Sequence, residues 1–185
     1  MSRIVVIGSS CSGKSTFSQY LAKKSEVEYI ELDQLHWLPN WKERPDEEFR
    51  ELVNKATSSS SWIVDGNYSV ARDIVWPRAT KIIWLNHSFS LVLYRSITRS
   101  IVRSATKKKL FAGNVESFKQ TFFSRDSIIL WVLKTYHNKR KSYFKLLKQI
   151  EAKGTEVIEL KNQTQVDDYL KAANHLHIKP IKSNG

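Results

Sequence analysis

The chain has a single cysteine, Cys11, among its 185 residues. One cysteine cannot form a disulfide within the chain, and this scarcity is typical of proteins in a reducing compartment. No group of Cys and His residues has the spacing of a zinc site. No apolar run approaches the roughly 20 residues that a membrane-spanning helix needs. We therefore expect a cytoplasmic protein without a membrane partner, in which any metal ion arrives together with a ligand.

Acidic residues are also scarce, with 18 Asp and Glu against 30 Lys and Arg and a net charge of +12. The whole imbalance lies between Arg95 and Lys148, where 14 basic residues stand against Glu116 and Asp126. A basic segment of this kind can bind nucleic acid, an anionic membrane surface or the phosphates of a small ligand. It can also be a solvated helix face, and the later part, residues 139–148, is typical of one.

Neither an internal repeat nor a linker divides the chain, and its length suits one ordinary domain. We expect a single domain over residues 1–185, with a lid-like insertion at about residues 104–125. The polar residues 179–185 are expected to form a flexible tail.

Short apolar segments alternate with amphipathic patterns along the chain. This alternation predicts a three-layer α/β/α sandwich around a five-stranded parallel sheet, a fold that binds ligands at the carboxyl ends of its strands. The expected strands are Ile4–Ile7, Glu28–Leu32, Trp62–Val64, Lys81–Leu85 and Glu156–Leu160. The expected helices are Ser15–Lys24, Glu47–Thr57, Phe89–Arg103, Ser127–Ala152, which Gly154 would cap, and Gln165–Asn174.

The segment between the first strand and the first helix reads Gly-Ser-Ser-Cys-Ser-Gly-Lys-Ser, from Gly8 to Ser15. It fills every position of the phosphate-binding pattern G-x-x-x-x-G-K-[S/T] in the required strand-to-helix context. Its glycines let backbone N–H groups converge on phosphate oxygens at a helix N-terminus. We expect Lys14 to reach the β- and γ-phosphates of ATP and Ser15 to hold Mg²⁺. The predicted nucleotide site comprises Gly8, Ser9, Ser10, Cys11, Ser12, Gly13, Lys14, Ser15 and Thr16.

Two aspartates follow predicted strands and should face this loop. Asp33 follows the second strand and Asp65 the third. A carboxylate there can hold Mg²⁺ through water or accept the proton of an attacking hydroxyl, although a turn or helix-cap aspartate is the simpler alternative. We assign the proton-accepting or metal-water role to Asp33 and the Mg²⁺ role to Asp65. Asn86 ends the fourth strand, where a strand-Asp-Glu type ATPase would carry carboxylates, so that type is disfavoured.

Arginines recur at helical spacing in the basic segment, at Arg95, Arg99 and Arg103, with Arg125 beyond a polar insertion. This pattern predicts a lid that closes over phosphates and brings cations to the transferred group. Arg99, Arg103 and Arg125 are the candidate catalytic cations, and a solvated arginine face is the alternative.

Aromatic residues surround the position after Asp33. Trp37 and Trp41 bracket a proline-containing loop and could stack against an acceptor, or could instead pack the following helix onto the sheet. His36 is a candidate substrate contact, although a hydrogen-bonded turn histidine is the simpler interpretation. Four other tryptophans fit strands or apolar helix faces and are expected in the core, namely Trp62, Trp76, Trp84 and Trp131.

Taken together, these motifs resemble those of the nucleoside monophosphate kinase-like P-loop proteins, and within them the adenylate kinase-related "topology modulation" proteins. The resemblance covers nearly the whole chain. It is carried by the phosphate loop and by the segments Leu32-Asp-Gln-Leu-His-Trp37, Pro39-Asn-Trp41, Trp62-Ile-Val-Asp-Gly-Asn-Tyr68, Arg72-Asp73 and Ile82-Ile-Trp-Leu85.

The resemblance implies the strand order 2-3-1-4-5, an arginine-bearing lid and an Asp65-Gly66 pair like that of the kinases. It also implies an acceptor site near Trp37 and Trp41, and we add Asn67, Tyr68 and Arg72 to the predicted substrate contacts. Asn67-Tyr68 stands where adenylate kinases carry Phe-Pro-Arg, which is a departure at the acceptor side.

The sequence thus favours a Mg²⁺- and ATP-dependent phosphotransferase of the nucleoside monophosphate kinase type, with a small hydroxyl- or phosphate-bearing acceptor. The alternative is a nucleotide-gated nucleic-acid-binding protein that uses the basic residues 95–148. A GTPase is disfavoured because no guanine-reading Asn-Lys-x-Asp element is present.

Overall fold

The computed structural model describes residues 2–107, 109–115 and 128–175. Its centre is a five-stranded sheet in the order β2-β5-β1-β6-β7, in which every neighbouring pair is parallel. The strands are β1 (Arg3–Gly8), β2 (Glu28–Glu31), β5 (Trp62–Asp65), β6 (Lys81–Leu85) and β7 (Glu156–Leu160). Counted along the chain, this order is 2-3-1-4-5, so the predicted topology is confirmed.

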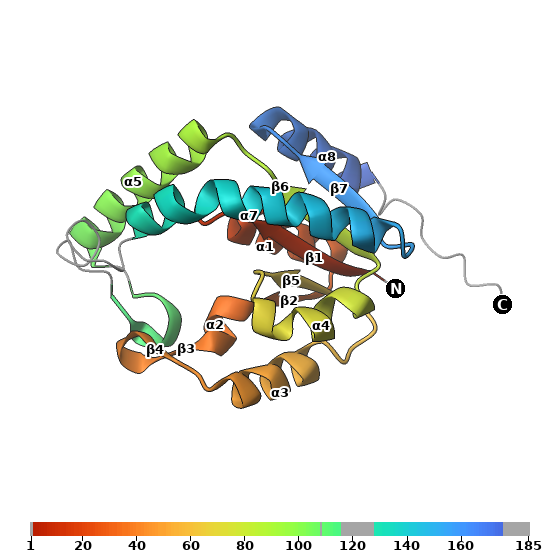
Figure 1. Cartoon of the computed structure of the whole chain (residues 1–185), viewed down its shortest axis with the longest axis horizontal. Coiled ribbons are helices and arrows are strands. Elements are labelled where there is room, and N and C mark those ends of the chain that lie inside the picture. Colours follow the sequence, from red (N-terminus) through yellow and green to blue (C-terminus); the bar gives the residue numbers. More distant parts are fainter. Residues whose placement is uncertain (1, 108, 116–127, 176–185) are drawn as a thin grey trace.

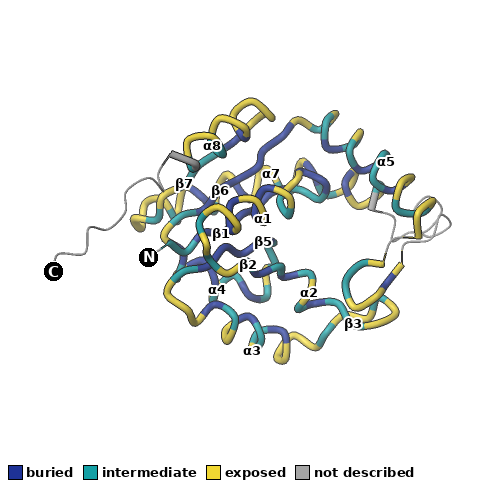
Figure 2. Tube along the Cα trace, turned by 180° about the vertical axis from the view of Figure 1, so that it is seen from behind, coloured by how far each residue is buried: buried dark blue, intermediate teal, exposed yellow. Residues whose placement is uncertain are grey.

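Helices cover both faces of the sheet, which confirms the three-layer fold (Figure 1). α1 (Lys14–Ser25) and α8 (Gln163–His175) pack on one face. α3 (Asp46–Ala56), α4 (Arg72–Val75) and α7 (Ile128–Glu151) pack on the other. Figure 2 shows buried residues concentrated along the central strands, while exposed residues follow the outer sides of α3, α5 and α8.

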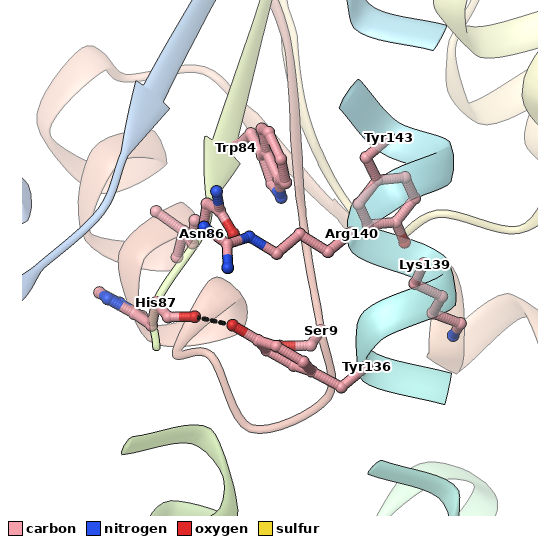
Figure 3. A pocket seen from close by; sticks show the side chains of 9 residues that line it. Ser9, Trp84, Asn86, His87, Tyr136, Lys139, Arg140 and Tyr143 are labelled. Atoms are coloured by element: carbon pink, nitrogen blue, oxygen red, sulfur yellow. Dashed lines mark hydrogen bonds between the residues drawn. The ribbon is translucent and has the colours of Figure 1, made fainter. Parts of the chain in front are cut away.

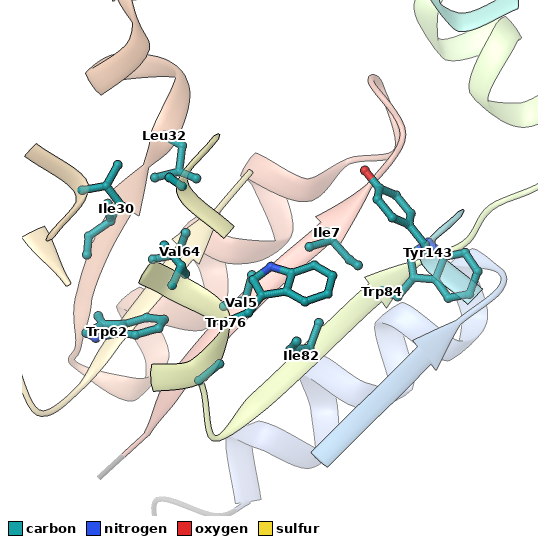
Figure 4. Packing of buried hydrophobic residues seen from close by; sticks show 14 of the residues in the cluster. Val5, Ile7, Ile30, Leu32, Trp62, Val64, Trp76, Ile82, Trp84 and Tyr143 are labelled. Atoms are coloured by element: carbon teal, nitrogen blue, oxygen red, sulfur yellow. The ribbon is translucent and has the colours of Figure 1, made fainter. Parts of the chain in front are cut away.

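The alternation of side chains along β1 explains why both faces need helices. Ile4 and Val6 point into the cluster under α1 and α8, whereas Val5 and Ile7 join the opposite cluster. Figure 4 shows the cluster that contains Val5 and Ile7, which also includes three tryptophans. Trp62, Trp76 and Trp84 are buried as predicted. The prediction for Trp131 is wrong, because 49% of this residue is exposed on α7.

The five predicted helices are all present, and no end is shifted by more than three residues. α5 (Phe89–Thr106) begins after Ser88, whose hydroxyl accepts a hydrogen bond from Leu91 N at 3.5 Å. After α7, the Gly154 N–H donates to Glu151 O at 2.9 Å with a φ of 94°, so this glycine serves the predicted helix-ending turn.

Several short elements near the carboxyl ends of the strands were not predicted. Leu32, expected to end a strand, instead begins α2 (Leu32–His36). α2 leads into a hairpin of β3 (Trp37–Leu38) and β4 (Lys42–Glu43) around η1 (Pro39–Trp41). The other short helices are η2 (Ser69–Ala71), η3 (Trp76–Arg78) and η4 (Phe111–Gly113). Their few residues give no periodic pattern that a sequence window could detect.

The predicted insertion lies between α5 and α7, which pack side by side. Its first part contains η4 and reaches the β3–β4 hairpin (Figure 1). Lys108, Arg125 and the predicted tail at residues 179–185 lie outside the described residues. Among the residues that the structure describes, no helix is both long and apolar enough to cross a bilayer.

Candidate functional site

The predicted phosphate loop curls between β1 and α1. Lys14 Nζ donates a hydrogen bond to Ser9 O across the loop, at 3.0 Å. Gly13 precedes α1 with a φ of 94°, a conformation that favours glycine. A Cβ on Gly8 would lie 2.8 Å from Leu85 O, so β1 and β6 also require a residue without a side chain there. The loop therefore has the strand-to-helix context that its motif requires.

Cys11 lies in this loop with a φ of 63°, and only 9% of it is exposed. Because the side chain is buried, any contribution of Cys11 to the predicted nucleotide site would come mainly from its backbone. Ser12 is buried as well, and its carbonyl accepts a hydrogen bond from Arg95 Nη1 at 3.2 Å.

Sheet register brings two carboxylates together beside the loop. Glu31 is paired with Asp65 across β2 and β5, and Asp65 is paired with Val6 across β5 and β1. Both acids therefore stand at the strand ends that face Ser15. Asp65 is only 3% exposed and accepts a hydrogen bond from the Tyr29 hydroxyl at 3.3 Å.

Burial raises the pKa of the Asp65 carboxyl, while the positive charge of Lys14 and the Ser15 hydroxyl oppose the shift. Burial also raises the pKa of Glu31; a hydrogen bond from Gln34 opposes this shift, and repulsion from Asp65 and Asp33 adds to it. Negative charge is therefore concentrated at this edge and would be relieved by a cation.

The geometry fits a magnesium ion. Asp65 Oδ1 is buried and makes no hydrogen bond to any described residue, which leaves a carboxylate oxygen oriented without a partner. No group of three Asp, Glu, His or Cys residues forms a ready-made metal cage within the described ranges. Mg²⁺ does not need one, because it commonly binds one or two carboxylates together with waters and substrate phosphates. Ser15, Asp65 and Glu31 are the residues that could hold it.

Asp33 lies on α2, which begins directly after β2. Its Oδ1 accepts a hydrogen bond from the Tyr68 hydroxyl. Burial and the nearby negative charge of Asp33 raise the pKa of Tyr68, so the phenol stays protonated and donates. The carboxylate of Asp33 is therefore oriented by a hydrogen bond from Tyr68.

The predicted aromatic contacts form one cluster behind Asp33. His36 is buried, and its ring lies 4.4 Å from Tyr68 and 4.8 Å from Trp37 between centroids. Trp37 and Trp41 meet edge to face at 5.5 Å and stay partly exposed. His36 is thus a packing residue within this aromatic cluster. Trp37 and Trp41 keep part of their surface exposed, where a ligand could contact them.

Asn67 and Arg72 are joined by a hydrogen bond from Arg72 Nε to Asn67 Oδ1, at 3.3 Å. The Arg72 guanidinium lies over the ring of Trp76, at 5.0 Å from its centroid. Tyr68, Asn67 and Arg72 line one small cavity at the end of β5. The structure therefore brings these three predicted substrate contacts together.

The arginine stripe of α5 starts at the phosphate loop. Arg95 bonds to Ser12 O and, through Nη2, to Gln163 Oε1 at 2.8 Å. Arg99 Nε is buried and has no hydrogen-bond partner among the described residues. Arg103 follows one turn later on the same helix, and Arg125 lies outside the described residues.

Sequence reasoning missed one cation. Lys139 of α7 was grouped with a solvated helix face, but it lines a small cavity with Ser9 of the loop and with Asn86 and Tyr136 (Figure 3). Burial lowers the pKa of Lys139, the charge of Lys14 lowers it further, and Asp33 acts in the opposite direction. No local motif marks this lysine, because its place depends on how α7 packs.

The acid Glu31 was also missed, although its position two residues before Asp33 was a usable signal.

Comparison with known proteins supports the fold. No protein-family model matches the chain. No curated protein sequence matches it either. Among solved structures, a gluconokinase from Sinorhizobium meliloti 1021 is 17% identical with a TM-score of 0.54, over 94% of this chain and 90% of that one. A shikimate kinase from Bacteroides thetaiotaomicron is 16% identical with a TM-score of 0.55, over 95% of this chain and 97% of that one.

Proposed function

We propose that the protein is an ATP- and Mg²⁺-dependent phosphotransferase that moves the γ-phosphoryl group of ATP to a small acceptor. The observation that carries the proposal is the meeting of the phosphate loop, the Glu31 and Asp65 carboxylates and the Tyr68-bound Asp33 at one sheet edge. The fold it shares with structures named as kinases of gluconate and shikimate supports the same chemistry.

The residues have distinct roles in this proposal. Lys14 and the loop backbone hold the donor phosphates, and Ser15 with Asp65 and Glu31 would hold Mg²⁺. When bound, the metal ion would neutralise charge on the phosphate oxygens. Asp33 accepts the proton of the attacking hydroxyl, and Tyr68 keeps that carboxylate in place. Arg99 and Arg103 of α5 and Arg125 of the predicted lid are candidates to stabilise the transferred group.

We favour a hydroxyl-bearing acceptor within this class. The acceptor side offers Asp33 as a proton acceptor and the exposed parts of Trp37 and Trp41 as an apolar wall. The alternative is a nucleoside monophosphate acceptor, which the kinase-like Asp65-Gly66 pair suggests. Arg72 would then be available to bind the phosphate of that acceptor.

The test is product analysis after incubation of the pure protein with ATP, Mg²⁺ and a panel of acceptors. The panel contains nucleosides, nucleoside monophosphates, sugars, sugar acids and polyols. We expect ADP formation to depend on one acceptor class and to fall about a hundredfold or more in Lys14→Ala, which removes a charge-stabilising donor. Circular dichroism verifies that the variant is folded.

The competing outcome is also measurable in this assay. If DNA or RNA stimulates ATP turnover and no small molecule does, the phosphotransferase proposal is wrong and the nucleic-acid alternative gains support.

A further inference from the structure

Lys139 and Trp131 form a pair on α7 that the predicted site did not include. The Lys139 ammonium lies over the Trp131 ring, 4.8 Å from its centroid. Trp131 is 49% exposed, although a tryptophan on an amphipathic helix normally faces the core. An exposed indole under a lysine is the arrangement of a cation–π contact.

The surroundings of Lys139 connect this pair to the phosphate loop. The residue lines the small cavity that also contains Ser9, and α7 is fixed there by a hydrogen bond of 2.6 Å from the Tyr136 hydroxyl to His87 O (Figure 3). The charges of Lys14 and Asp33 both act on the Lys139 ammonium. Lys139 therefore stands in the electric field of the donor site and of the acceptor site together.

Among the residues that the structure describes, no acidic side chain forms an ion pair with Lys139 that would account for its half-buried charge. Removing an ammonium from water is costly unless a negative charge or an aromatic face replaces the lost hydration. Trp131 gives only part of that compensation, so an anionic ligand would bind Lys139 more strongly than the indole does.

We propose that Lys139 is a catalytic residue that binds the phosphoryl group in transfer, and that Trp131 is the positioning residue that holds its ammonium ready. This inference rests on the proposed phosphotransferase function. The acceptor oxygen forms a bond to the γ-phosphorus while the bond from that phosphorus to the bridging β–γ oxygen breaks and ADP leaves. The acceptor proton passes to Asp33, and Lys139 stabilises the negative oxygens of the transferred group.

The first experiment measures binding and does not need a known acceptor. Titration calorimetry with ADP and with a non-hydrolysable ATP analogue gives the ratio of the two affinities. We expect Lys139→Ala to weaken binding of the ATP analogue about tenfold and to leave ADP binding within about threefold. Lys139→Arg should restore most of the loss. Unchanged binding of both nucleotides in Lys139→Ala would overturn the proposal.

The second experiment separates positioning from general packing, and α7 supplies a matched control. Lys148 lies over the ring of Phe144 at the same 4.8 Å, and Phe144 is 50% exposed. We expect Trp131→Ala to lower the preference for the ATP analogue over ADP and Trp131→Phe to restore it. Phe144→Ala and Lys148→Ala should leave that preference unchanged. An equal effect from both pairs, or none from Trp131→Ala, would contradict the role of Trp131.

Failure of the inference and failure of the proposed function give different results. If the wild type binds neither nucleotide, or if Lys14→Ala binds both as well as the wild type does, the phosphotransferase proposal fails. If Lys14→Ala weakens both nucleotides while Lys139→Ala weakens neither, only the role of Lys139 is lost. Once an acceptor is known, Lys139→Ala should also lower kcat by about a hundredfold or more.

Discussion

At the scale of single residues, charged side chains that serve the fold differ from the buried carboxylate of Asp65. Arg50 is paired with Asp73 at 2.8 Å on the surface, and Arg44 binds Leu35 O at 2.8 Å, so both arginines serve the fold. Asp65 instead keeps a buried carboxylate oxygen without a hydrogen bond in the described structure. Such a group costs stability and is retained where it meets a ligand.

Asp65→Asn should therefore stabilise the protein without ligand at neutral pH. Because the folded pKa of Asp65 lies above the unfolded value, folding favours the protonated carboxyl, and stability falls as pH rises from the unfolded pKa through the folded one. The amide cannot ionise and avoids this penalty. Thermal unfolding should show a higher Tm for the variant at pH 7 and little difference below about pH 4, where the unfolded carboxyl is also protonated.

The same variant should lose the stabilisation that Mg²⁺ with ATP gives the wild type, since a ligand that binds only the folded state raises its Tm. A variant that is less stable than the wild type at neutral pH, or equally stabilised by Mg²⁺-ATP, would show that Asp65 is neither a destabilising buried acid nor a Mg²⁺ ligand.

At the scale of elements, the insertion between α5 and α7 makes a specific contact with the β3–β4 hairpin. Asn114 is 6% exposed, accepts from Trp41 N at 3.0 Å and donates through Nδ2 to Leu38 O at 2.9 Å. Asn40 and Trp41 both have φ near 60°, which is unusual for residues other than glycine. The Asn114 side chain thus holds a strained turn of the hairpin.

Asn114→Ala should cost about 1–3 kcal/mol of unfolding free energy, because it removes two hydrogen bonds to partly buried backbone groups. It should also speed protease cleavage at the hairpin and at residues 109–115 together, since each segment supports the other. Asn114→Asp, which keeps the acceptor oxygen but loses the Nδ2 donor, is the graded control. Urea unfolding and limited proteolysis measure both effects, and an unchanged cleavage pattern in Asn114→Ala would show that the contact does not hold the segments.

The basic residues of α7 fall into two groups by exposure. Lys139 is half-buried at the site, whereas Lys141, Lys145 and Lys148 are exposed. Joint replacement of the three exposed lysines by alanine should change acceptor-stimulated turnover by less than about twofold, because a solvated face contributes little. Steady-state kinetics on the triple variant tests this.

DNA binding by the same triple variant supplies the contrast. If these lysines form a nucleic-acid surface, each lost phosphate contact should lower the salt slope of binding by about one. A large loss of DNA affinity with no change in turnover would favour a nucleic-acid role for this face.

At the scale of the whole molecule, the net charge of +12 opposes compaction because like charges repel one another more strongly when the chain is folded. The Debye length falls from about 30 Å at 0.01 M salt to about 8 Å at 0.15 M. We therefore expect Tm to rise by a few degrees over this range of sodium chloride. A Tm that is flat or falls with salt would show that the positive charges are already compensated within the fold.

The sequence alone determined the layers of this protein and its phosphate loop. Short apolar strands, amphipathic helices and a contiguous eight-residue motif are local patterns, so each can be recognised within a short stretch of sequence. The five strands and the five long helices were therefore predictable, as was Lys14. Asp33 and Asp65 followed from the rule that ligands bind at strand ends.

Only the tertiary structure decided which other charges reach the site. Glu31 meets Asp65 through strand register, and Asn114 meets the hairpin across 73 residues of sequence. In the sequence, Lys139 cannot be distinguished from its solvated neighbours. Its proposed role depends on which face of α7 packs near Ser9, and the hydrogen bond from Tyr136 to His87 fixes that face. Burial and the field of distant charges are properties of the packed molecule, so no pattern within one segment could reveal them.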